Sequence, residues 1–124
     1  MKVLMVDNEA AILKLVEIAL DDEDEIELEM VDNGSDGIKQ LSSNVYDVFI
    51  FDLMMPPPDG RALLRAVRAD PMNWMKPVII CTAKTDSANT ESLKAEGATK
   101  VLTKPFRPLA LADQLREIVA QSRT

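Results

Sequence analysis

The strongest constraint on the fold is a set of short apolar runs that recur along the chain. The clearest runs are Val3–Val6, Val48–Phe51, Val78–Cys81 and Val101–Leu102. They are continuous rather than alternating and rich in β-branched and aromatic residues, which is typical of parallel strands buried on both faces. A weaker segment, Ile26–Val31, alternates and indicates an edge strand. The intervals between runs all exceed the dozen residues that a crossover helix needs.

Apolar residues recur at helical spacing between these runs. The pattern i, i+3, i+4, i+7 appears in the first interval, and similar stripes precede Asp70 and close the chain. The three stripes are Ile12, Leu15, Val16 and Ala19; Leu63, Leu64 and Val67; and Leu111, Leu115, Ile118 and Val119. Weaker patterns predict helices over 35–41 and 87–96, with Gly97 suited to the position after the second.

Strand and helix segments thus alternate five times. This order predicts an α/β fold: a doubly wound, five-stranded parallel sheet flanked by five helices. The 124 residues suffice for one domain, at roughly 150 residues per domain, so we expect a single domain over residues 1–124. Whether it stands alone or is part of a longer protein stays open.

Composition excludes several classes of function. The net charge of −7 argues against nucleic acid or an anionic membrane as a direct partner. The chain has no histidine and a single cysteine, Cys81, which rules out Ser-His-Asp catalysis and thiolate zinc sites. Any metal must therefore bind oxygen, as Mg²⁺, Mn²⁺ and Ca²⁺ do. No apolar stretch approaches the roughly 18 residues that span a bilayer, and we expect a cytoplasmic protein.

Polar residues follow the predicted strands. They are Asp7, Asn8 and Glu9; Asp52; Thr82; and Thr103 and Lys104. Because parallel strands end at one edge of the sheet, where open α/β folds bind ligands, we expect these side chains to converge. Crowded carboxylates favour a hard divalent cation, and a lysine beside them can neutralise phosphoryl oxygens. Asp52 could itself be a nucleophile that forms an acyl phosphate.

Four motifs of the chain resemble those of one known family. Asp52–Gly60 reads D-x-x-M-P-x-x-D-G, Val6–Glu9 places acidic residues after the first strand, Thr82-Ala83 follows the fourth, and Thr103–Phe106 contains Lys-Pro-Phe. In this order and at these spacings they resemble the receiver domain of two-component response regulators, and the resemblance covers the whole chain.

The resemblance implies a role for each site residue. Asp52 would accept a phosphoryl group from a sensor histidine kinase or phosphotransfer protein. Lys104 would bind a phosphoryl oxygen, and Thr82 would move toward the group and report its arrival to a downstream effector protein. The domain would be no enzyme beyond catalysing its own phosphorylation and dephosphorylation. The Lys104-Pro105 bond would be cis.

The implied cofactor is Mg²⁺. Its ligands would be Asp7, Asn8, Asp52 and the backbone carbonyl of Met54. Asn8 stands where the family usually has an aspartate, so we expect weaker Mg²⁺ binding than is usual, with Glu9 as a possible replacement for the lost charge. A role for Asn8 as the N-cap of the first helix is the structural alternative.

Other departures from the family pattern concern the conformational switch and the lifetime of the acyl phosphate. Val101 replaces an aromatic residue that many relatives carry; it is either core filler or part of the switch. The Pro56–Pro58 run should stiffen the loop after Asp52 and keep it pre-ordered; a harmless loop variant is the alternative. Met54 and Lys84 occupy positions that tune hydrolysis of the acyl phosphate, and their bulk predicts a lifetime of minutes or more. Surface filler is the alternative for both.

Rival functions remain beside this one. A receiver-like module that binds proteins without phosphorylation is favoured by Asn8 and Val101. A phosphatase with an aspartate nucleophile would need a second Asp where Met54 stands. An electron carrier that binds flavin would not place an acidic loop after the first strand. We expect Cys81 to be a buried small hydrophobe, Trp74 to cover a core edge, and Asp21–Glu25 to be a solvated turn.

Overall fold

The computed structural model describes residues 1–83, 87–104 and 107–122, and for 87–89 the backbone alone. Five parallel strands form one sheet in the order β2-β1-β3-β4-β5. The strands are β1 (Lys2–Val6), β2 (Glu27–Val31), β3 (Val48–Asp52), β4 (Val78–Ala83) and β5 (Lys100–Lys104). The helices are α1 (Ala10–Leu20), α2 (Gly34–Ser43), α3 (Gly60–Ala69), α4 (Ser87–Ala95) and α5 (Leu111–Ser122), with a 3₁₀ turn, η1, at Pro108–Ala110. The predicted fold class is confirmed.

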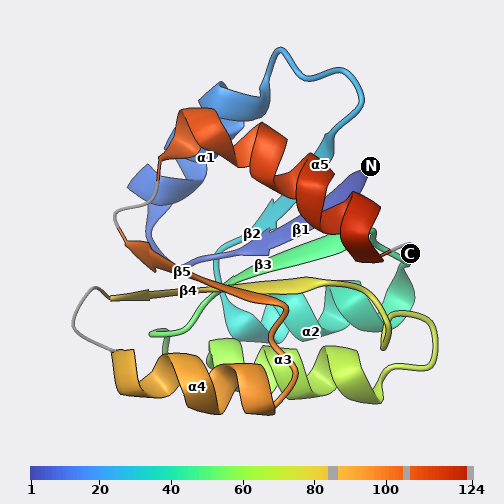
Figure 1. Cartoon of the computed structure of the whole chain (residues 1–124), viewed down its shortest axis with the longest axis vertical. Helices are drawn as coiled ribbons and strands as arrows, with labels where there is room; N and C mark the ends of the chain where they lie inside the picture. Colours follow the sequence, from blue (N-terminus) through green and yellow to red (C-terminus); the bar gives the residue numbers. More distant parts are fainter. Residues whose placement is uncertain (84–86, 105–106, 123–124) are drawn as a thin grey trace.

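Helices cover both faces of the sheet (Figure 1). Helices α1 and α5 lie on one face, and α2, α3 and α4 on the other. Each face has its own hydrophobic core, and alternate residues of the central strands point into the two cores. Strand β3 is buried along its whole length, because it lies in the middle of the sheet. Continuous apolar runs are the expected signature of such strands.

The edge strand β2 also agrees with the sequence. It pairs with β1 alone, from Lys2↔Glu27 to Val6↔Val31, and none of its residues is fully buried. The predicted cap of α4 is likewise confirmed. Gly97 has a φ of 112°, its N–H donates to the Lys94 carbonyl, and the Ala98 N–H donates to that of Leu93. These two bonds form a Schellman motif, which requires the left-handed conformation that glycine adopts at little cost.

The apolar stripe of α1 differs from the prediction. Val16 and Leu20 are the buried residues of this helix, whereas Leu15 is 51% exposed. The segment Leu13–Leu20 holds more apolar residues than one face can bury, so spacing alone could not identify those that face the core. The stripes of α3 and α5 are confirmed in full, since every predicted residue is buried.

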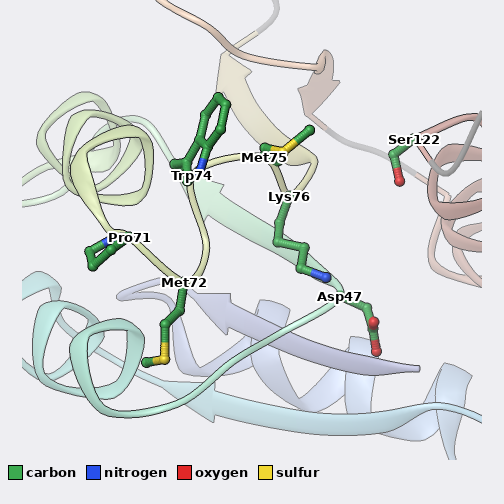
Figure 2. A pocket seen from close by; sticks show the side chains of 7 residues that line it. All are labelled: Asp47, Pro71, Met72, Trp74, Met75, Lys76 and Ser122. Atoms are coloured by element: carbon green, nitrogen blue, oxygen red, sulfur yellow. The ribbon is translucent and has the colours of Figure 1, made fainter.

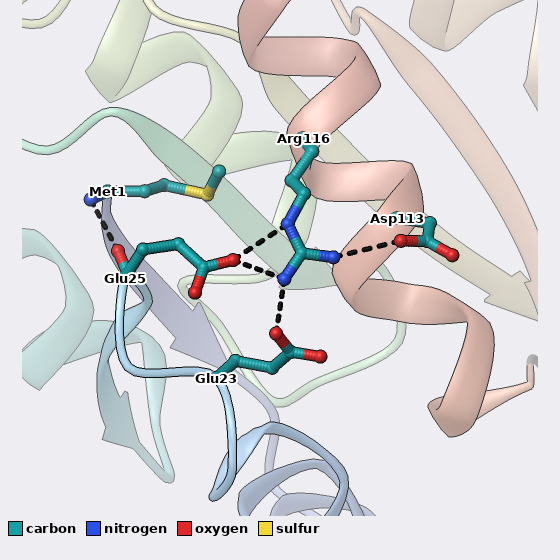
Figure 3. A network of polar contacts seen from close by, with 5 residues as sticks. All are labelled: Met1, Glu23, Glu25, Asp113 and Arg116. Carbon is teal, nitrogen blue, oxygen red and sulfur yellow. Dashed lines mark hydrogen bonds and ion pairs between the residues drawn. The ribbon is translucent and has the colours of Figure 1, made fainter.

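The acidic segment 21–25 is not merely a solvated turn. Arg116 of α5 pairs with Glu23 and Glu25 from this segment and with Asp113 of its own helix (Figure 3). The amine of Met1 donates to the Glu25 carbonyl at 2.7 Å. The ion pairs of Arg116 hold α5 against the segment between α1 and β2, and the Met1 amine holds the start of the chain against the same segment. No helix in the described part of the chain is long and apolar enough to cross a membrane.

Candidate functional site

The carboxyl edge of the sheet gathers the polar residues that the sequence singled out. Asp7 follows β1, Asp52 ends β3, Thr82 lies near the end of β4, and Lys104 ends β5. Strands β3 and β4 pair in parallel with Asp52 opposite Cys81, so Thr82 lies one residue beyond it. Each of these side chains is held by a strand with a fixed register. The structure therefore brings the predicted residues to one rim, as expected.

The Lys104 ammonium joins the carboxylates of the rim. Its Nζ lies 3.0 Å from Asp7 Oδ2, 3.2 Å from Asp52 Oδ1 and 3.4 Å from Glu9 Oε1. Asp7 and Asp52 are almost fully buried, at 1% and 4% exposure, whereas Glu9 faces solvent. Among the described residues, Lys104 pairs with three carboxylates, so these four side chains together carry an excess of negative charge.

Burial and neighbouring charges shift the pKa values of Asp52 and Lys104. Burial and the nearby charge of Asp7 raise the pKa of Asp52, against the opposing influence of Lys104. Burial alone would lower the pKa of Lys104, but its hydrogen bond to Asp7 and the charges of Asp52 and Asp7 outweigh this and raise it. Lys104 is therefore a permanent cation at neutral pH, and Asp52 is a carboxylate that its surroundings make less acidic.

The oxygen donors at this rim fit a divalent cation. Single ligand oxygens of Asp7, Glu9 and Asp52 all lie within 4.8 Å of one another. Carboxylate oxygens are the ligands that Mg²⁺ prefers, and a second cation would offset the negative charge that Lys104 leaves. The sequence named Glu9 only as a substitute for Asn8, yet the structure groups its carboxylate with the two buried aspartates. Its place directly after Asp7-Asn8 was the available signal.

Asn8 does not cap helix α1. The helix begins at Ala10, its N-cap is Glu9, and no side chain caps it. The N-cap alternative for Asn8 is therefore wrong. Asn8 is exposed and lines a small cavity of about 120 Å³, together with the start of α2 and the loop after Asp52.

The loop between β3 and α3 is tied to the site at both of its ends. The Leu53 N–H donates to the Cys81 carbonyl at 2.9 Å, and Asp59 caps α3 by accepting from the Ala62 N–H at 3.0 Å. A Cβ at Gly60 would overlap the Asp52 carbonyl oxygen, so only glycine fits there. Met54 is 69% exposed, and the Pro57-Pro58 bond is cis.

The remaining predicted residues have mixed outcomes. Thr82 is buried at the rim, and Val101 is half-buried and packs against the core on the α2–α4 face. Lys84 and the Lys104-Pro105 bond lie outside the described residues. Cys81 is buried as predicted, and burial raises the pKa of its thiol to about 12, which leaves it unreactive.

A larger cavity lies away from this chemistry. It has a volume of about 410 Å³ and is lined by the segment before β4, by Asp47 just before β3 and by Ser122 at the end of α5 (Figure 2). Trp74 lines it and is 53% exposed, so the expectation that this ring covers a core edge is wrong. The cavity borders the amino ends of the central strands, opposite Asp52.

Comparisons with known proteins match the chain to one family and one fold. Residues 3–116 match the family described as the response regulator receiver domain. The chain is 30% identical, over 119 residues, to the response regulator ArlR of Staphylococcus saprophyticus; the match covers 95% of this chain and 52% of that protein. The chain spans about half the length of the curated relatives it matches.

Solved structures share the whole fold. The receiver domain of the Francisella response regulator 1452 is 29% identical, with a TM-score of 0.85 and coverage of 98% of both chains. The receiver domain of the sensor histidine kinase PA1611 from Pseudomonas aeruginosa has a TM-score of 0.83 over 96% of this chain and 97% of that one. That structure contains a magnesium ion in its active-site cleft; at 23% identity the likeness shows the fold alone.

Proposed function

Since this chain belongs to the response regulator receiver domains, we propose that Asp52 accepts a phosphoryl group from a phosphohistidine of a histidine kinase or phosphotransfer protein. The observation that carries the proposal is the ammonium of Lys104, which lies between the buried carboxylates of Asp7 and Asp52. An isolated buried carboxylate would be costly, whereas one beside a fixed cation and a metal site can act as a nucleophile.

The chain's own residues support each part of this transfer. A carboxylate oxygen of Asp52 would attack phosphorus, an O–P bond would form, and the N–P bond of the donor would break with the electron pair returning to the donor imidazole. Lys104 would neutralise a phosphoryl oxygen that takes the place of its present carboxylate contacts. Asp7, Asp52 and the Met54 carbonyl, together with Asn8 or with the Glu9 carboxylate that the structure groups with the two aspartates, would hold Mg²⁺, which supplies charge neutralisation at the phosphoryl oxygens when bound. The reaction modifies the domain itself and turns over no free substrate.

Phosphorylation would change the surface near β4 and β5. The new group adds charge and strong acceptor oxygens at the rim. Hydrogen bonds from Lys104 and Thr82 to charged oxygens contribute about 1.5–3 kcal/mol each. Reversing a two-state population from 1:99 to 99:1 takes about 5.5 kcal/mol, so two such bonds approach what a full switch needs. An effector protein that reads the altered face would complete the signal.

Intact mass spectrometry tests the proposal. The protein is incubated with Mg²⁺ and acetyl phosphate, and we expect the mass to increase by one phosphoryl group. Asp52→Asn should show no increase. Asp59→Asn is the matched control, because Asp59 lies in the same loop and asparagine retains its capping function. After removal of the donor, the adduct should persist for minutes.

An unchanged mass in the wild type would contradict the proposal. That result would favour the alternative of a receiver-like module that binds its partner without phosphorylation. If Asp52→Asn gained a phosphoryl group to the wild-type level, the acceptor would be another residue.

A further inference from the structure

Helix α2 touches the loop after Asp52 through a backbone contact. Gly34 is the first residue of this helix and is buried. A Cβ built on Gly34 would overlap the Pro58 carbonyl oxygen and would lie 2.9 Å from both the carbonyl carbon and Cγ of Pro58. The nearest atom belongs to the backbone and cannot rotate away as a side chain could. Any residue larger than glycine would therefore displace either the loop or the start of the helix.

Glycine is needed at this position for space and not for an unusual backbone conformation. The only glycine with a positive φ in the described part of the chain is Gly97. An alanine at position 34 could thus adopt the same backbone angles, and alanine is the better helix former. The whole penalty of Gly34→Ala should then come from the contact with Pro58, so a substitution reports on that contact.

The start of α2 is itself fixed to the candidate site. Asn33 caps the helix by accepting from the Asp36 N–H at 2.8 Å, and its amide donates to the side chains of Asp32 and Asp36. Just before the cap, the Val31 carbonyl accepts from the N–H of Asp7 at 3.2 Å. The backbone of a proposed metal ligand is therefore hydrogen-bonded to the segment that leads into Gly34.

The middle of the loop has one other anchor, Met55, whose side chain packs into the core on the α2–α4 face and also lines the small cavity beside Asn8. Met54, Pro56 and Pro57 are exposed. The loop ends are held by β3 and by the Asp59 cap of α3. Between those ends, the contact of Pro58 with Gly34 fixes how closely the loop approaches the helix. The backbone N–H of Met54, in the same loop, donates to the Asp52 carboxylate, so a displaced loop would disturb the proposed metal ligands.

We propose that Gly34 is a positioning residue for the loop after Asp52: its missing side chain lets α2 support the Pro58 carbonyl and so holds the loop in place for cation binding and phosphoryl transfer. The inference deepens the proposed function and rests on it for the transfer step. The placement of the loop itself can be tested without that step, through cation binding alone.

Gly37 provides a matched control in the same helix. It is buried, and a Cβ there would lie 3.0 Å from Cγ2 of Val6 and 3.3 Å from Cδ2 of Leu63. Both neighbours are the ends of side chains in the core, away from the loop. Gly37→Ala therefore disturbs packing beneath α2 without touching Pro58.

The experiment measures Mg²⁺ affinity by calorimetry, phosphorylation rate with acetyl phosphate, and thermal stability for both variants. Gly34→Ala should weaken Mg²⁺ binding about tenfold, the lower end of what a disturbed outer shell costs. Its phosphorylation rate should fall by about tenfold or more, since displacement of a site by the order of 1 Å can cost a hundredfold. Gly37→Ala should keep both values within about twofold of wild type, as a substitution that leaves the loop in place should.

Each outcome bears on the proposal. Wild-type Mg²⁺ affinity in Gly34→Ala, or an equal loss in Gly37→Ala, would overturn it. If Gly34→Ala does not fold, it is combined with Pro58→Gly, whose freer backbone lets the carbonyl move aside. Recovery of the fold in the double variant supports the contact, and failure to recover overturns it. A wild type that binds Mg²⁺ but takes no phosphoryl group would remove the proposed function, while the affinities of the variants would still decide the role of Gly34.

Discussion

At the scale of single residues, the surroundings of Asp52 favour the neutral carboxylic acid over the carboxylate. Its carboxylate is 4% exposed, and burial and Asp7 raise its pKa. In the range between the unfolded value, about 3.9, and the raised folded value, the native state binds a proton that the unfolded chain lacks. Stability therefore falls as the pH rises through this range, and at neutral pH the ionised Asp52 destabilises the fold.

Asp52→Asn should accordingly stabilise the protein at pH 7. Without metal we expect a gain of about 1 kcal/mol in the free energy of unfolding, within the usual range for point substitutions. The gain should shrink as the pH falls from the raised folded value toward about 3.9 and should vanish below it, where Asp52 is protonated in both states. Urea titrations at several pH values measure this. Asp24→Asn, which removes an exposed carboxylate, is the control for net charge. A destabilised Asp52→Asn at pH 7 would mean that its ion pair with Lys104 outweighs burial.

At the scale of elements, Arg68 connects helix α3 to the segments that precede β4 and β5. Its guanidinium donates to the Gly97 carbonyl at 3.1 and 2.6 Å, and to the carbonyls of Trp74 and Lys76 at 2.9 and 2.7 Å. Burial lowers the pKa of Arg68, and its described hydrogen bonds go to neutral acceptors. The guanidinium thus satisfies three backbone carbonyls in two segments that have no regular structure.

Arg68→Met should therefore destabilise the fold by about 2–3 kcal/mol, because it leaves several carbonyls without a donor. Arg65→Met is the matched control. Arg65 lies one turn earlier on α3 and makes an exposed ion pair with Glu96, which should contribute no more than about 1 kcal/mol. Chemical denaturation of the two variants gives the comparison. Equal losses would show that the carbonyls around Arg68 find water or other donors.

The sequence predicted elements well where periodicity and burial agree. The apolar pattern predicted the central strands and the stripes of α3 and α5 correctly, because the residues of each pattern are buried along the whole element. Helix α1 was not, because Leu15 is apolar and yet exposed. Trp74 was misplaced for a similar reason: hydrophobicity favours burial of a large ring but does not require it.

The candidate site was predictable in outline and not in its supports. Parallel strands bring Asp7, Asp52 and Lys104 to one edge, so their convergence follows from the strand order. The contact between Gly34 and Pro58 joins two segments that the sequence does not relate, and only the backbone path reveals it. Helix α1 begins at Ala10, so Asn8 is free of the capping role that its residue type favours.

At the scale of the whole molecule, the net charge is −7, and three carboxylates gather around one cation at each edge of the sheet. At the amino edge, Arg116 pairs with Glu23, Glu25 and Asp113, all of them at least partly exposed. At the carboxyl edge, Lys104 pairs with Asp7, Glu9 and Asp52, and the two aspartates are buried. A cation that binds the native rim and not the unfolded chain must stabilise the fold by mass action.

Mg²⁺ should therefore raise the melting temperature. At ten times the dissociation constant the gain is about 1.4 kcal/mol, which corresponds to roughly 3–6 °C for a domain of this size. Asp7→Asn should remove most of the shift. Asn8→Asp should enlarge it at a fixed low Mg²⁺ concentration, by about 1 kcal/mol if the added carboxylate tightens binding several-fold. The shift, and not the melting temperature itself, is the quantity compared, because an added carboxylate also changes the stability of the metal-free protein.

Two controls separate this site from general screening of the acidic surface. NaCl at matched ionic strength accounts for screening. Glu27→Gln removes an exposed acid near the amino edge, and its Mg²⁺ shift should equal that of wild type. A similar loss of the shift in Glu27→Gln and Asp7→Asn would indicate diffuse binding by the acidic surface. Equal shifts in wild type and Asn8→Asp would show that Glu9 already supplies the charge that Asn8 lacks.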